Sequence, residues 1–284
     1  MQGGPPGGGT ARPSLPPGDG ARFHRAPLSF IRSAPRRGVD PAGWVLVAVG
    51  LAAGAVSSMF GVGGGLVVVP VLHYLFKVDF RVATVTSLVA IAVQSPFGVL
   101  QHARRGVVSW RLGAWLAGGG AFGVAAGVWL QPRIPVSGLK VLLAGLMAFG
   151  AWRMVASPPR PRGAGLATPW VGATGVVAGA ASRLLGIGGG LIAVPVLALG
   201  GTPMHQAVGS SLVAVFTNSL LAAAIAAAAG FDPGSALWLA AGAILGSPLG
   251  VRLAHAIPEL GLRRAFAGGL GVAALYVAAT SGAL

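Results

Sequence analysis

A glycine-rich motif followed by proline occurs twice in this chain, inside hydrophobic stretches 125 residues apart. The copies are FGVGGGLVVVPVL (residues 60–72) and LGIGGGLIAVPVL (residues 185–197). Glycine has a weak helix propensity, and proline removes a backbone donor and clashes with the preceding turn, so each copy should interrupt a helix. In a membrane, such a break survives only where protein buries it or where it lines a watery cavity. Matched breaks in two halves of a chain indicate the binding site of a transporter.

The composition is that of a protein with many membrane-spanning segments. Of 284 residues, 54% are hydrophobic and 9% are charged, whereas about a quarter of the residues in soluble domains are charged. The net charge is +15, but the basic residues lie in the N-terminal tail and between the hydrophobic stretches. Charges that determine membrane topology are found there. We therefore expect the lipid bilayer, and no nucleic acid, as a partner.

The residues that most enzymes and metal sites require are missing. Cysteine is absent, and the five histidines are scattered without metal-ligand spacing. Thiolate sites and disulfides are thus excluded, and we expect no metal and no cofactor. Leu66 and Leu191 replace the final glycine of a dinucleotide-binding motif. We therefore expect no enzymatic activity.

The two halves of the chain are copies of one another. The sequence Ser-Leu-Val-Ala at 87–90 recurs at 211–214, and Gln94-Ser95 corresponds to Asn218-Ser219. Each half has one interrupted hydrophobic stretch and further apolar segments. This pattern predicts an all-α integral membrane protein of about eight transmembrane segments in two homologous repeats, each opened by a Gly-rich broken helix. The predicted organisation is a disordered, basic, cytoplasmic tail (1–42), a first membrane repeat (43–156), a linker (157–168) and a second membrane repeat (169–284).

The stretch from Gly43 to Phe76 is too long for one straight helix. Its 34 residues would extend about 51 Å, whereas the hydrocarbon core is about 30 Å thick. A break at residues 61–65 is therefore expected. If the broken segment spans the membrane, the halves cross four times each and are parallel. If it folds back, they cross three times and are inverted. The distribution of Lys and Arg favours the parallel arrangement.

The doubled motif resembles the TauE/SafE family of sulfite and sulfonate transporters. The matching residues are Gly61-Val-Gly-Gly-Gly65 through Pro70 and Gly186-Ile-Gly-Gly-Gly190 through Pro195. The resemblance covers about residues 43 to 280. It implies a multi-pass protein of the bacterial inner membrane that transports, in the direction of export, small sulfur-containing or organic anions such as sulfite and sulfonates. The substrate would lie between the two broken helices.

Two features could bind an anion. Helix N-termini after Gly63, Gly64 and Gly65, and after Gly188, Gly189 and Gly190, would present free backbone N–H groups. Arg183 lies inside a hydrophobic segment, where a guanidinium costs about 2.5–3.5 kcal/mol, and its planar fork suits an oxyanion. The alternatives are close helix packing for the glycines and an interfacial position for the guanidinium.

Small polar residues recur at equivalent positions in the two halves and could complete the shell of the anion. Helix-to-helix hydrogen bonding is the alternative for them. These further candidates are Ser58 (the counterpart of Arg183), Gln94, Asn218, Ser87 and Ser211, with Pro70 and Pro195 in structural roles.

Proton coupling has no evident carrier in the sequence. Asp79, Asp232 and Glu259 are expected in loops, and His73 and His205 at membrane interfaces. Coupling could use the proton of sulfite itself or be absent. An anion channel, and a non-transporting membrane scaffold or assembly protein, remain as alternative functions. A homo-oligomer is compatible with the sequence.

Overall fold

The structure is a computed structural model that describes residues 43–156, 167–227 and 230–280. Every regular element within these residues is helical, as the sequence predicts. The prediction of a tail over residues 1–42 lies outside the described residues, as does most of the predicted linker.

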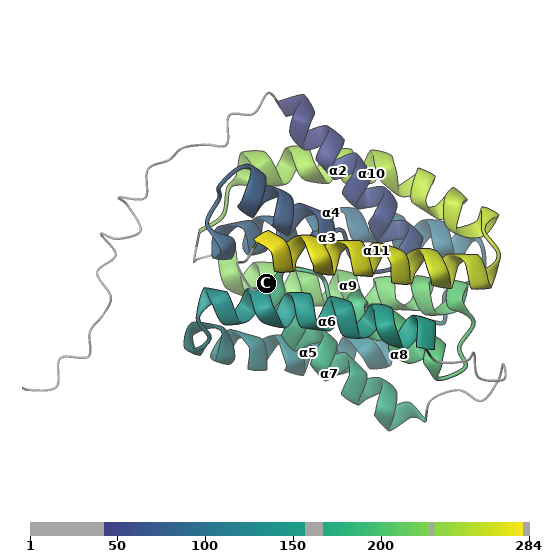
Figure 1. The fold of residues 1–284 in the computed structure, drawn as a ribbon. Coiled ribbons are helices and arrows are strands. Elements are labelled where there is room, and N and C mark those ends of the chain that lie inside the picture. The colour runs from purple at the N-terminus through teal and green to yellow at the C-terminus, as the bar shows by residue number, and fades with distance from the viewer. Residues whose placement is uncertain (1–42, 157–166, 228–229, 281–284) are drawn as a thin grey trace, which may run out of the picture. The chain divides into compact units, whose positions relative to one another are not determined.

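The helices follow the same order in both repeats (Figure 1). The first repeat contains α2 (Gly43–Phe60), α3 (Gly65–Pro70), the π-helical η1 (Val71–Leu75), α4 (Phe80–Arg104), α5 (Trp110–Leu130), the 3-10 helix η2 (Gln131–Arg133) and α6 (Val136–Ala156). The second contains α7 (Thr168–Leu185), α8 (Gly190–Leu199), α9 (Met204–Ala226), α10 (Pro233–Ala256) and α11 (Glu259–Thr280). Seven helices, namely α2, α4, α5, α6, α9, α10 and α11, are long and apolar enough to cross a membrane. The chain is a multi-pass membrane protein.

Both glycine motifs break the helix, as predicted. α2 ends at Phe60 and α3 begins at Gly65, while α7 ends at Leu185 and α8 begins at Gly190. Glycines with positive φ lie in both breaks, Gly63 at 89° and Gly188 at 78° among them. Side chains with a Cβ atom rarely adopt this conformation, which explains the composition of the motif.

After each break the chain folds back along the helix it has just left. A Cβ atom on Gly64 would lie 3.3 Å from the carbonyl oxygen of Ala53, well back along α2. Further along the returning segment, Leu72 packs in one cluster with Leu46. α7 and α8 form the equivalent hairpin, in which a Cβ atom on Gly189 would lie 2.5 Å from the carbonyl oxygen of Ala178. Each broken segment is therefore a helical hairpin.

The two repeats are inverted relative to one another. α4 and α9 are equivalent helices, yet they run antiparallel, because His102 near the end of α4 lies against Gly209 near the start of α9. α6 and α11 also run antiparallel, and Nε of Arg263 donates to the carbonyl oxygen of Met154 at 2.8 Å. The parallel arrangement favoured by the charge distribution is thus wrong. A segment that folds back does not carry the chain across, so the later helices of the two repeats point in opposite directions.

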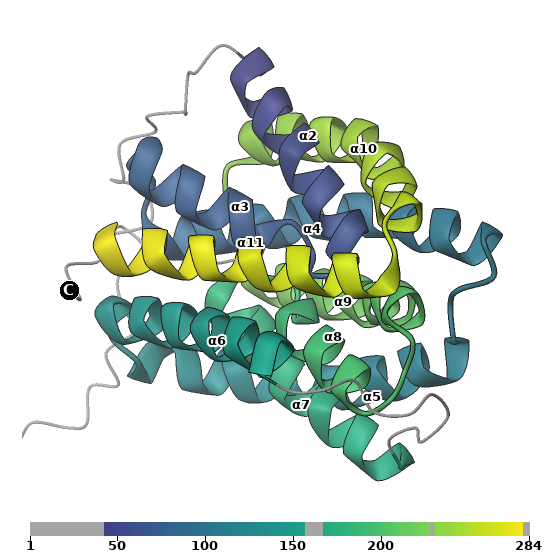
Figure 2. The ribbon, with the colours of Figure 1, turned by 45° about the vertical axis from the view of Figure 1, so that its right-hand side comes forward.

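The repeats interlock through the helix pairs α2–α10 and α5–α7 (Figure 2), and glycines line both contacts. α2 runs beside α10, where a Cβ atom on Gly54 would lie 2.1 Å from the carbonyl oxygen of Ala243. α7 runs beside α5 in the same way, with Gly179 equally close to the carbonyl oxygen of Gly120. Small residues allow such close approach between membrane helices. The opening helix of each repeat thus packs on a late helix of the other.

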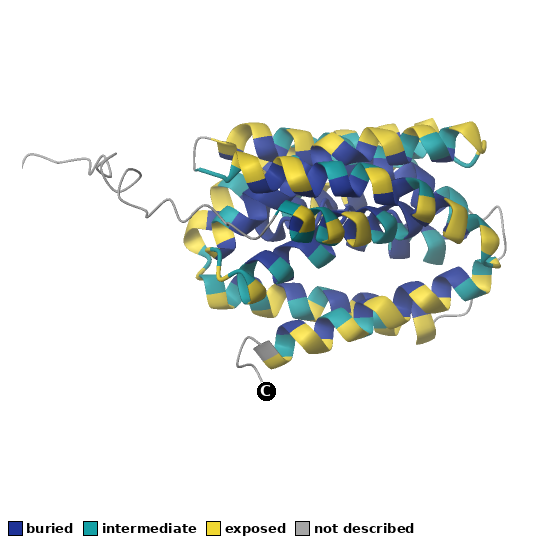
Figure 3. Ribbon diagram, turned by 90° about the horizontal axis from the view of Figure 1, so that it is seen from above, coloured by how far each residue is buried: buried dark blue, intermediate teal, exposed yellow. Residues whose placement is uncertain are grey.

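The equivalent helices α4 and α9 form the centre of the helical unit. They are the most buried of the candidate spans, at 67% and 61% of their most apolar windows. Figure 3 shows buried residues gathered in the middle and exposed residues on the outward faces. We call the end where α4 begins and α9 ends end 1, and the end where α4 ends and α9 begins end 2.

Candidate functional site

The two motif loops meet near the centre of the helical unit. We call residues 61–64 loop 1 and residues 186–189 loop 2. A Cβ atom on Gly65 would lie 2.1 Å from the carbonyl oxygen of Gly186, and one on Gly190 would lie 1.9 Å from the carbonyl oxygen of Gly61. The loops are therefore in direct backbone contact. The first residue of each short helix faces a carbonyl of the opposite loop, so this arrangement leaves no room for an anion directly between them.

Ser87 and Ser211 bind the loops reciprocally. The hydroxyl of Ser87 on α4 donates to the carbonyl oxygen of Gly186 in loop 2 at 3.1 Å. The hydroxyl of Ser211 on α9 lies 2.9 Å from the carbonyl oxygen of Gly61 in loop 1, and also 2.9 Å from that of Val208. Each central helix thus holds the loop of the other repeat. In this arrangement the two serines position the backbone.

Gln94 and Asn218 occupy equivalent positions but have different surroundings. Nε2 of Gln94 donates to Oγ of Ser57 on α2 at 2.7 Å. The residue equivalent to Ser57 in the second repeat is Ser182, and the Asn218 side chain is one methylene shorter than that of Gln94. Both amide atoms of Asn218 and the hydroxyl of Ser182 are buried without a hydrogen-bond partner among the described residues.

Ser219 lies beside this unsatisfied pair and beside loop 2. Its hydroxyl is buried without a partner in the described part of the chain. It lies 3.4 Å from the position that a Cβ atom on Gly188 would take. Buried polar groups are almost always hydrogen-bonded to protein, water or a bound molecule. The unsatisfied donors of the second repeat therefore indicate a binding site for a polar molecule.

Arg183 lies near end 1 on the last turn of α7. It is 7% exposed, and its Nε and Nη1 atoms are buried with no hydrogen-bond partner among the described residues. Its Cβ atom packs on Gly127 of α5, and its carbonyl oxygen accepts from Nε2 of Gln131 at 3.4 Å. Arg81, at the start of α4, is close enough to interact with it electrostatically.

Glycines of α5 connect Arg183 to Asn218. A Cβ atom on Gly120 would lie 2.1 Å from Oδ1 of Asn218, and one on Gly127 would lie 2.9 Å from Cβ of Arg183. Seven residues correspond to about two helical turns, so these glycines lie on one face of α5, roughly 10 Å apart. Arg183 and Asn218 therefore border the same side of that helix. The sequence did not indicate this glycine face or Ser182.

Ser58, the counterpart of Arg183, lies elsewhere. Its hydroxyl is 2.7 Å from that of Ser247, and its carbonyl oxygen is 2.8 Å from Nε2 of His102. His102 is 18 residues beyond Thr84, the α4 residue that faces Gly186 in loop 2. This separation is about 27 Å along the helix axis. The structure thus does not bring Ser58 and Arg183 together.

Three histidines that are scattered in the sequence meet at end 2. The ring of His255 on α10 lies 5.3 Å from that of His102 and 5.2 Å from that of His205. His73 lies apart from them and is 2.9 Å from the carbonyl oxygen of Val78. No spacing in the sequence indicates the cluster, because its members come from three helices of both repeats. Within the described residues, no group of His, Cys, Asp or Glu side chains is arranged to hold a metal ion.

One of the three acidic residues, Glu259, differs from its predicted position. Asp79 and Asp232 precede α4 and α10 and cap their N-termini. Glu259 is not in a loop as predicted but is the first residue of α11, and its carboxylate accepts from the backbone N–H of Met204 at 2.8 Å. The carboxylate satisfies a free donor at the start of α9.

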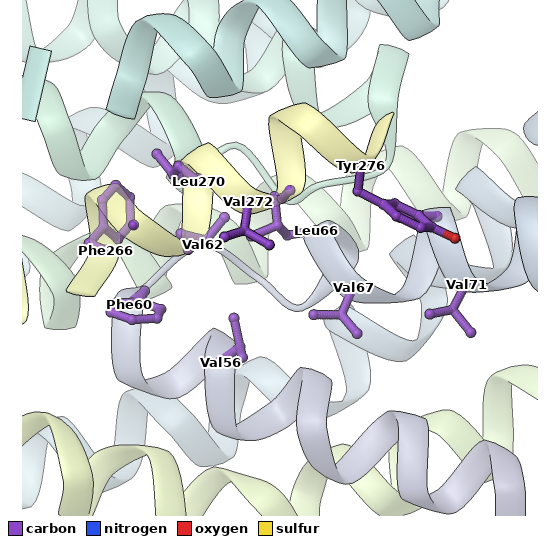
Figure 4. Close-up of a pocket in the computed structure, with 14 residues that line it drawn as sticks. Val56, Phe60, Val62, Leu66, Val67, Val71, Phe266, Leu270, Val272 and Tyr276 are labelled. Carbon is purple, nitrogen blue, oxygen red and sulfur yellow. The ribbon is translucent and has the colours of Figure 1, made fainter. Parts of the chain in front are cut away.

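An apolar cavity of 470 Å³ lies between the first hairpin and α11. Figure 4 shows Val62, Leu66 and Val67 on one side and Phe266 and Val272 on the α11 side. Its lining is almost wholly hydrocarbon, and Tyr276 is the one described lining residue with a polar side-chain group. The first motif therefore borders apolar space, whereas the unsatisfied hydroxyl of Ser219 lies beside the second motif.

Comparison with known proteins agrees with this architecture. The profile described as Sulfite exporter TauE/SafE matches residues 46–277. A probable membrane transporter protein of Methanocaldococcus jannaschii is 27% identical over 185 residues, which cover 62% of this chain and 69% of that protein. A probable membrane transporter protein of Xylella fastidiosa is 32% identical over 185 residues, covering 62% and 71%. One of Haemophilus influenzae is 31% identical over 172 residues, covering 57% and 65%. No solved structure matches the chain.

Proposed function

The chain belongs to the sulfite exporter TauE/SafE family of membrane transporters, and on this premise we propose that it exports small sulfur-containing or organic anions of the sulfite and sulfonate class. We place it in the bacterial plasma membrane with its N-terminal tail in the cytoplasm. The negative electrical potential inside the cell favours outward movement of an anion by about 2.3 kcal/mol per charge per 100 mV. The direction of transport therefore follows the membrane potential.

The observation that carries this proposal is the asymmetry between the two repeats. In the first repeat, Nε2 of Gln94 donates to Oγ of Ser57, and only Oε1 of that amide has no partner among the described residues. In the second, Ser182, Asn218 and Ser219 have buried polar atoms without a partner among the described residues, and the Ser219 hydroxyl lies beside loop 2. Their hydroxyl and amide groups can donate to an oxyanion, and being uncharged they allow its release. The proposed site thus lies on the flank of loop 2, close to the predicted position between the broken helices.

Arg183 supplies the charge that attracts the anion. Two of its guanidinium nitrogens are buried without a partner in the described residues. No carboxylate competes for it within α7, α5 or α9, which contain no Asp or Glu. A charge-assisted hydrogen bond to a sulfonate or sulfite oxygen would satisfy these donors, since the guanidinium fork matches planar oxyanion geometry. Arg183 is therefore the proposed entry contact on the side of end 1.

The contact between the loops supports a carrier over a channel. The backbone of loop 1 touches that of loop 2, as Gly65 and Gly186 illustrate. Inverted repeats that meet at a central site can exchange conformations and so open alternately to the two sides. Passage requires the hairpins to separate, which makes transport a conformational cycle.

Thermal shift on the purified full chain tests the proposal. Sulfite, sulfoacetate, taurine, sulfate, thiosulfate and chloride would each be added to the wild type and to Arg183→Ala. We expect a sulfur oxyanion to raise the unfolding midpoint of the wild type and to leave that of Arg183→Ala unchanged. Export of the same anion from proteoliposomes would then establish transport. If no anion shifts the midpoint and none is released, a membrane scaffold becomes the better explanation.

A further inference from the structure

The apolar cavity between the first hairpin and α11 has the length and volume of a binding site. Figure 4 shows Phe60 and Phe266 at one end and Tyr276 at the other, and the two phenylalanine rings pack edge to face at 5.4 Å. Ten residues of α11 separate Phe266 from Tyr276, which is about 15 Å along the helix axis. The volume of 470 Å³ lies within the range of about 300–1,000 Å³ found for ligand pockets. The cavity can therefore hold a hydrocarbon chain.

Two glycines of α11 enlarge this cavity. Gly268 and Gly269 line it, and a Cβ atom on either of them would have no described atom within 4 Å. Gly54 of α2 differs, because a Cβ atom there would lie 2.1 Å from a carbonyl oxygen of α10. Glycine is a poor helix former, and at positions 268 and 269 it brings no other helix closer. The two glycines therefore keep space open beside the first hairpin.

The cavity is accessible from the outward face of α11. Val272 lines the cavity, and its side chain is nevertheless 71% exposed. α11 is one of the helices long and apolar enough to cross a membrane, so its exposed apolar face meets lipid. Lipid tails are as apolar as leucine side chains. An acyl chain can therefore enter the cavity from the bilayer.

A polar group lies directly beyond the Tyr276 end of the cavity. The ring of Tyr276 is 5.9 Å from that of Tyr74 on η1, and Nζ of Lys140 on α6 is 5.3 Å from the centre of the Tyr74 ring. The hydroxyl of Tyr74 is buried and has no hydrogen-bond partner among the described residues. Buried polar groups are almost always hydrogen-bonded. This phenol therefore indicates a missing acceptor beside the ammonium of Lys140.

The polar group lies toward end 1 of the helical unit. α11 begins at end 2, where Glu259 accepts from the backbone N–H of Met204 at the start of α9. α6 runs antiparallel to α11, so Tyr276 and Lys140 both lie toward end 1. Tyrosine is enriched at membrane interfaces, and lysine near a helix end extends its ammonium to the interface. The group is therefore at the depth of lipid headgroups.

The charge of this region complements an anion. Glu259 is the one acidic residue of η1, α6 and α11, and it lies at the opposite end of α11 from Tyr276. Asp79, which precedes α4 at end 1, accepts from backbone N–H groups of α4. Lys77, three residues after Tyr74, is exposed and adds a second positive charge. A phosphate beside Lys140 would pair with its ammonium and give Tyr74 an acceptor.

We propose that an anionic phospholipid binds here, with one acyl chain in the cavity and its phosphate beside Lys140 and Tyr74. We call this the lipid site. The chain lies over Gly268 and Gly269, and the headgroup joins η1 to α6. Binding is non-covalent and goes beyond the proposed export, because it does not depend on the transported anion.

Native mass spectrometry of the full chain in a non-ionic detergent tests the lipid site. Dioleoyl phosphatidylglycerol is the probe, dioleoyl phosphatidylcholine is the zwitterionic comparison, and glycerol 3-phosphate is a headgroup without chains. Lys140→Gln removes the charge, and Gly269→Leu places a side chain in the cavity. The matched controls are Arg264→Gln, an exposed cation nearer the start of α11, and Gly271→Leu, where an added Cβ atom also has no described atom within 4 Å but lies outside the cavity lining.

We expect the wild type and both controls to bind phosphatidylglycerol about fivefold more tightly than phosphatidylcholine, the contribution of one lysine near an anionic lipid. Glycerol 3-phosphate should not bind. Lys140→Gln should lose the preference between the two lipids. Gly269→Leu should bind phosphatidylglycerol about tenfold more weakly, since excluding two methylenes of the chain is enough for this loss.

Unchanged binding in Lys140→Gln or in Gly269→Leu, or an equal loss in their controls, would overturn the lipid site. Equal affinity of the wild type for both lipids would overturn the anionic headgroup, and binding of glycerol 3-phosphate alone would replace the lipid with a free phosphate ester. A dimer that Gly269→Leu dissociates would assign the cavity to a second copy of the chain. These measurements count bound molecules, so a failure to transport anions would overturn the proposed export and leave the lipid site standing.

Discussion

The carbonyl oxygen of Gly186 lies 2.1 Å from the position that a Cβ atom on Gly65 would occupy, and the same relationship at 1.9 Å joins Gly61 to Gly190. Each motif therefore requires glycine at the point where the backbone of the other motif approaches it. Each supplies the glycine that makes room for a carbonyl of the opposite loop. The recurrence of the motif in both halves follows from this reciprocal contact.

Alanine at either contact glycine should destabilise the protein. Gly65→Ala and Gly190→Ala push a methyl group into backbone, and overpacking of this kind costs about 1–3 kcal/mol. The unfolding midpoint in detergent should fall clearly for both. Gly118→Ala and Gly145→Ala are the controls, because nothing lies within 4 Å of their added methyl groups. A midpoint that falls equally in the controls would show that the loop contact is not the cause.

The inverted arrangement predicts which loops share a side of the membrane. Arg105 follows α4 at end 2, whereas Phe231 follows α9 at end 1, where the neighbouring Asp232 N–H lies 3.4 Å from Oγ1 of Thr86. The chain has no cysteine, so Arg105→Cys and Phe231→Cys each introduce a single thiol. A membrane-impermeant maleimide on intact cells should label one and not the other. Labelling of both cysteines from the same side would contradict the inverted arrangement and support parallel repeats.

The sequence predicted the helices and their breaks well. Length, glycine and proline placed the interruption of the first stretch after Phe60, and α3 begins at Gly65 as expected. These features are local, so residue composition determines them. Pro195 has a different effect from the one expected, because it lies inside α8 and does not end it, whereas Pro70 is the last residue of α3. After Pro70 the chain continues as the π-helix η1.

The relation between the halves could not be read from the sequence. Whether loop 1 folds back along α2 depends on contacts such as that of Gly64 with Ala53, which the apolar pattern does not distinguish from a crossing. The position of Ser58 and the meeting of His102 with His255 depend on the same inversion. The hydrogen bond between Gln94 and Ser57 also joins two different helices, so the sequence alone does not predict it.

Removal of the Arg183 guanidinium should weaken anion binding far more than removal of an exposed charge. Hydrogen bonds to charged groups contribute about 1.5–3 kcal/mol, which corresponds to an increase in Kd of about 10- to 100-fold. Arg183→Lys should recover part of this, since it keeps the charge but loses the fork. Arg111→Gln, at an exposed position of α5, is the control. Anion titrations monitored by thermal shift measure all three, and equal affinities in Arg183→Ala and Arg111→Gln would contradict the proposed role.

Adding one methylene to the side chain at position 218 should replace the anion site with a hydrogen bond between α9 and α7. Asn218→Gln gives the second repeat the side chain with which Gln94 reaches Ser57 at 2.7 Å, so its amide should donate to Ser182. We expect an unchanged or higher unfolding midpoint, loss of the anion-induced shift and transport reduced about tenfold, the worth of one or two lost hydrogen bonds. The reverse change, Gln94→Asn, should strand Ser57 and destabilise the protein by about 1–3 kcal/mol while anion binding persists. Full transport by Asn218→Gln would show that the unsatisfied groups of the second repeat do not hold the anion.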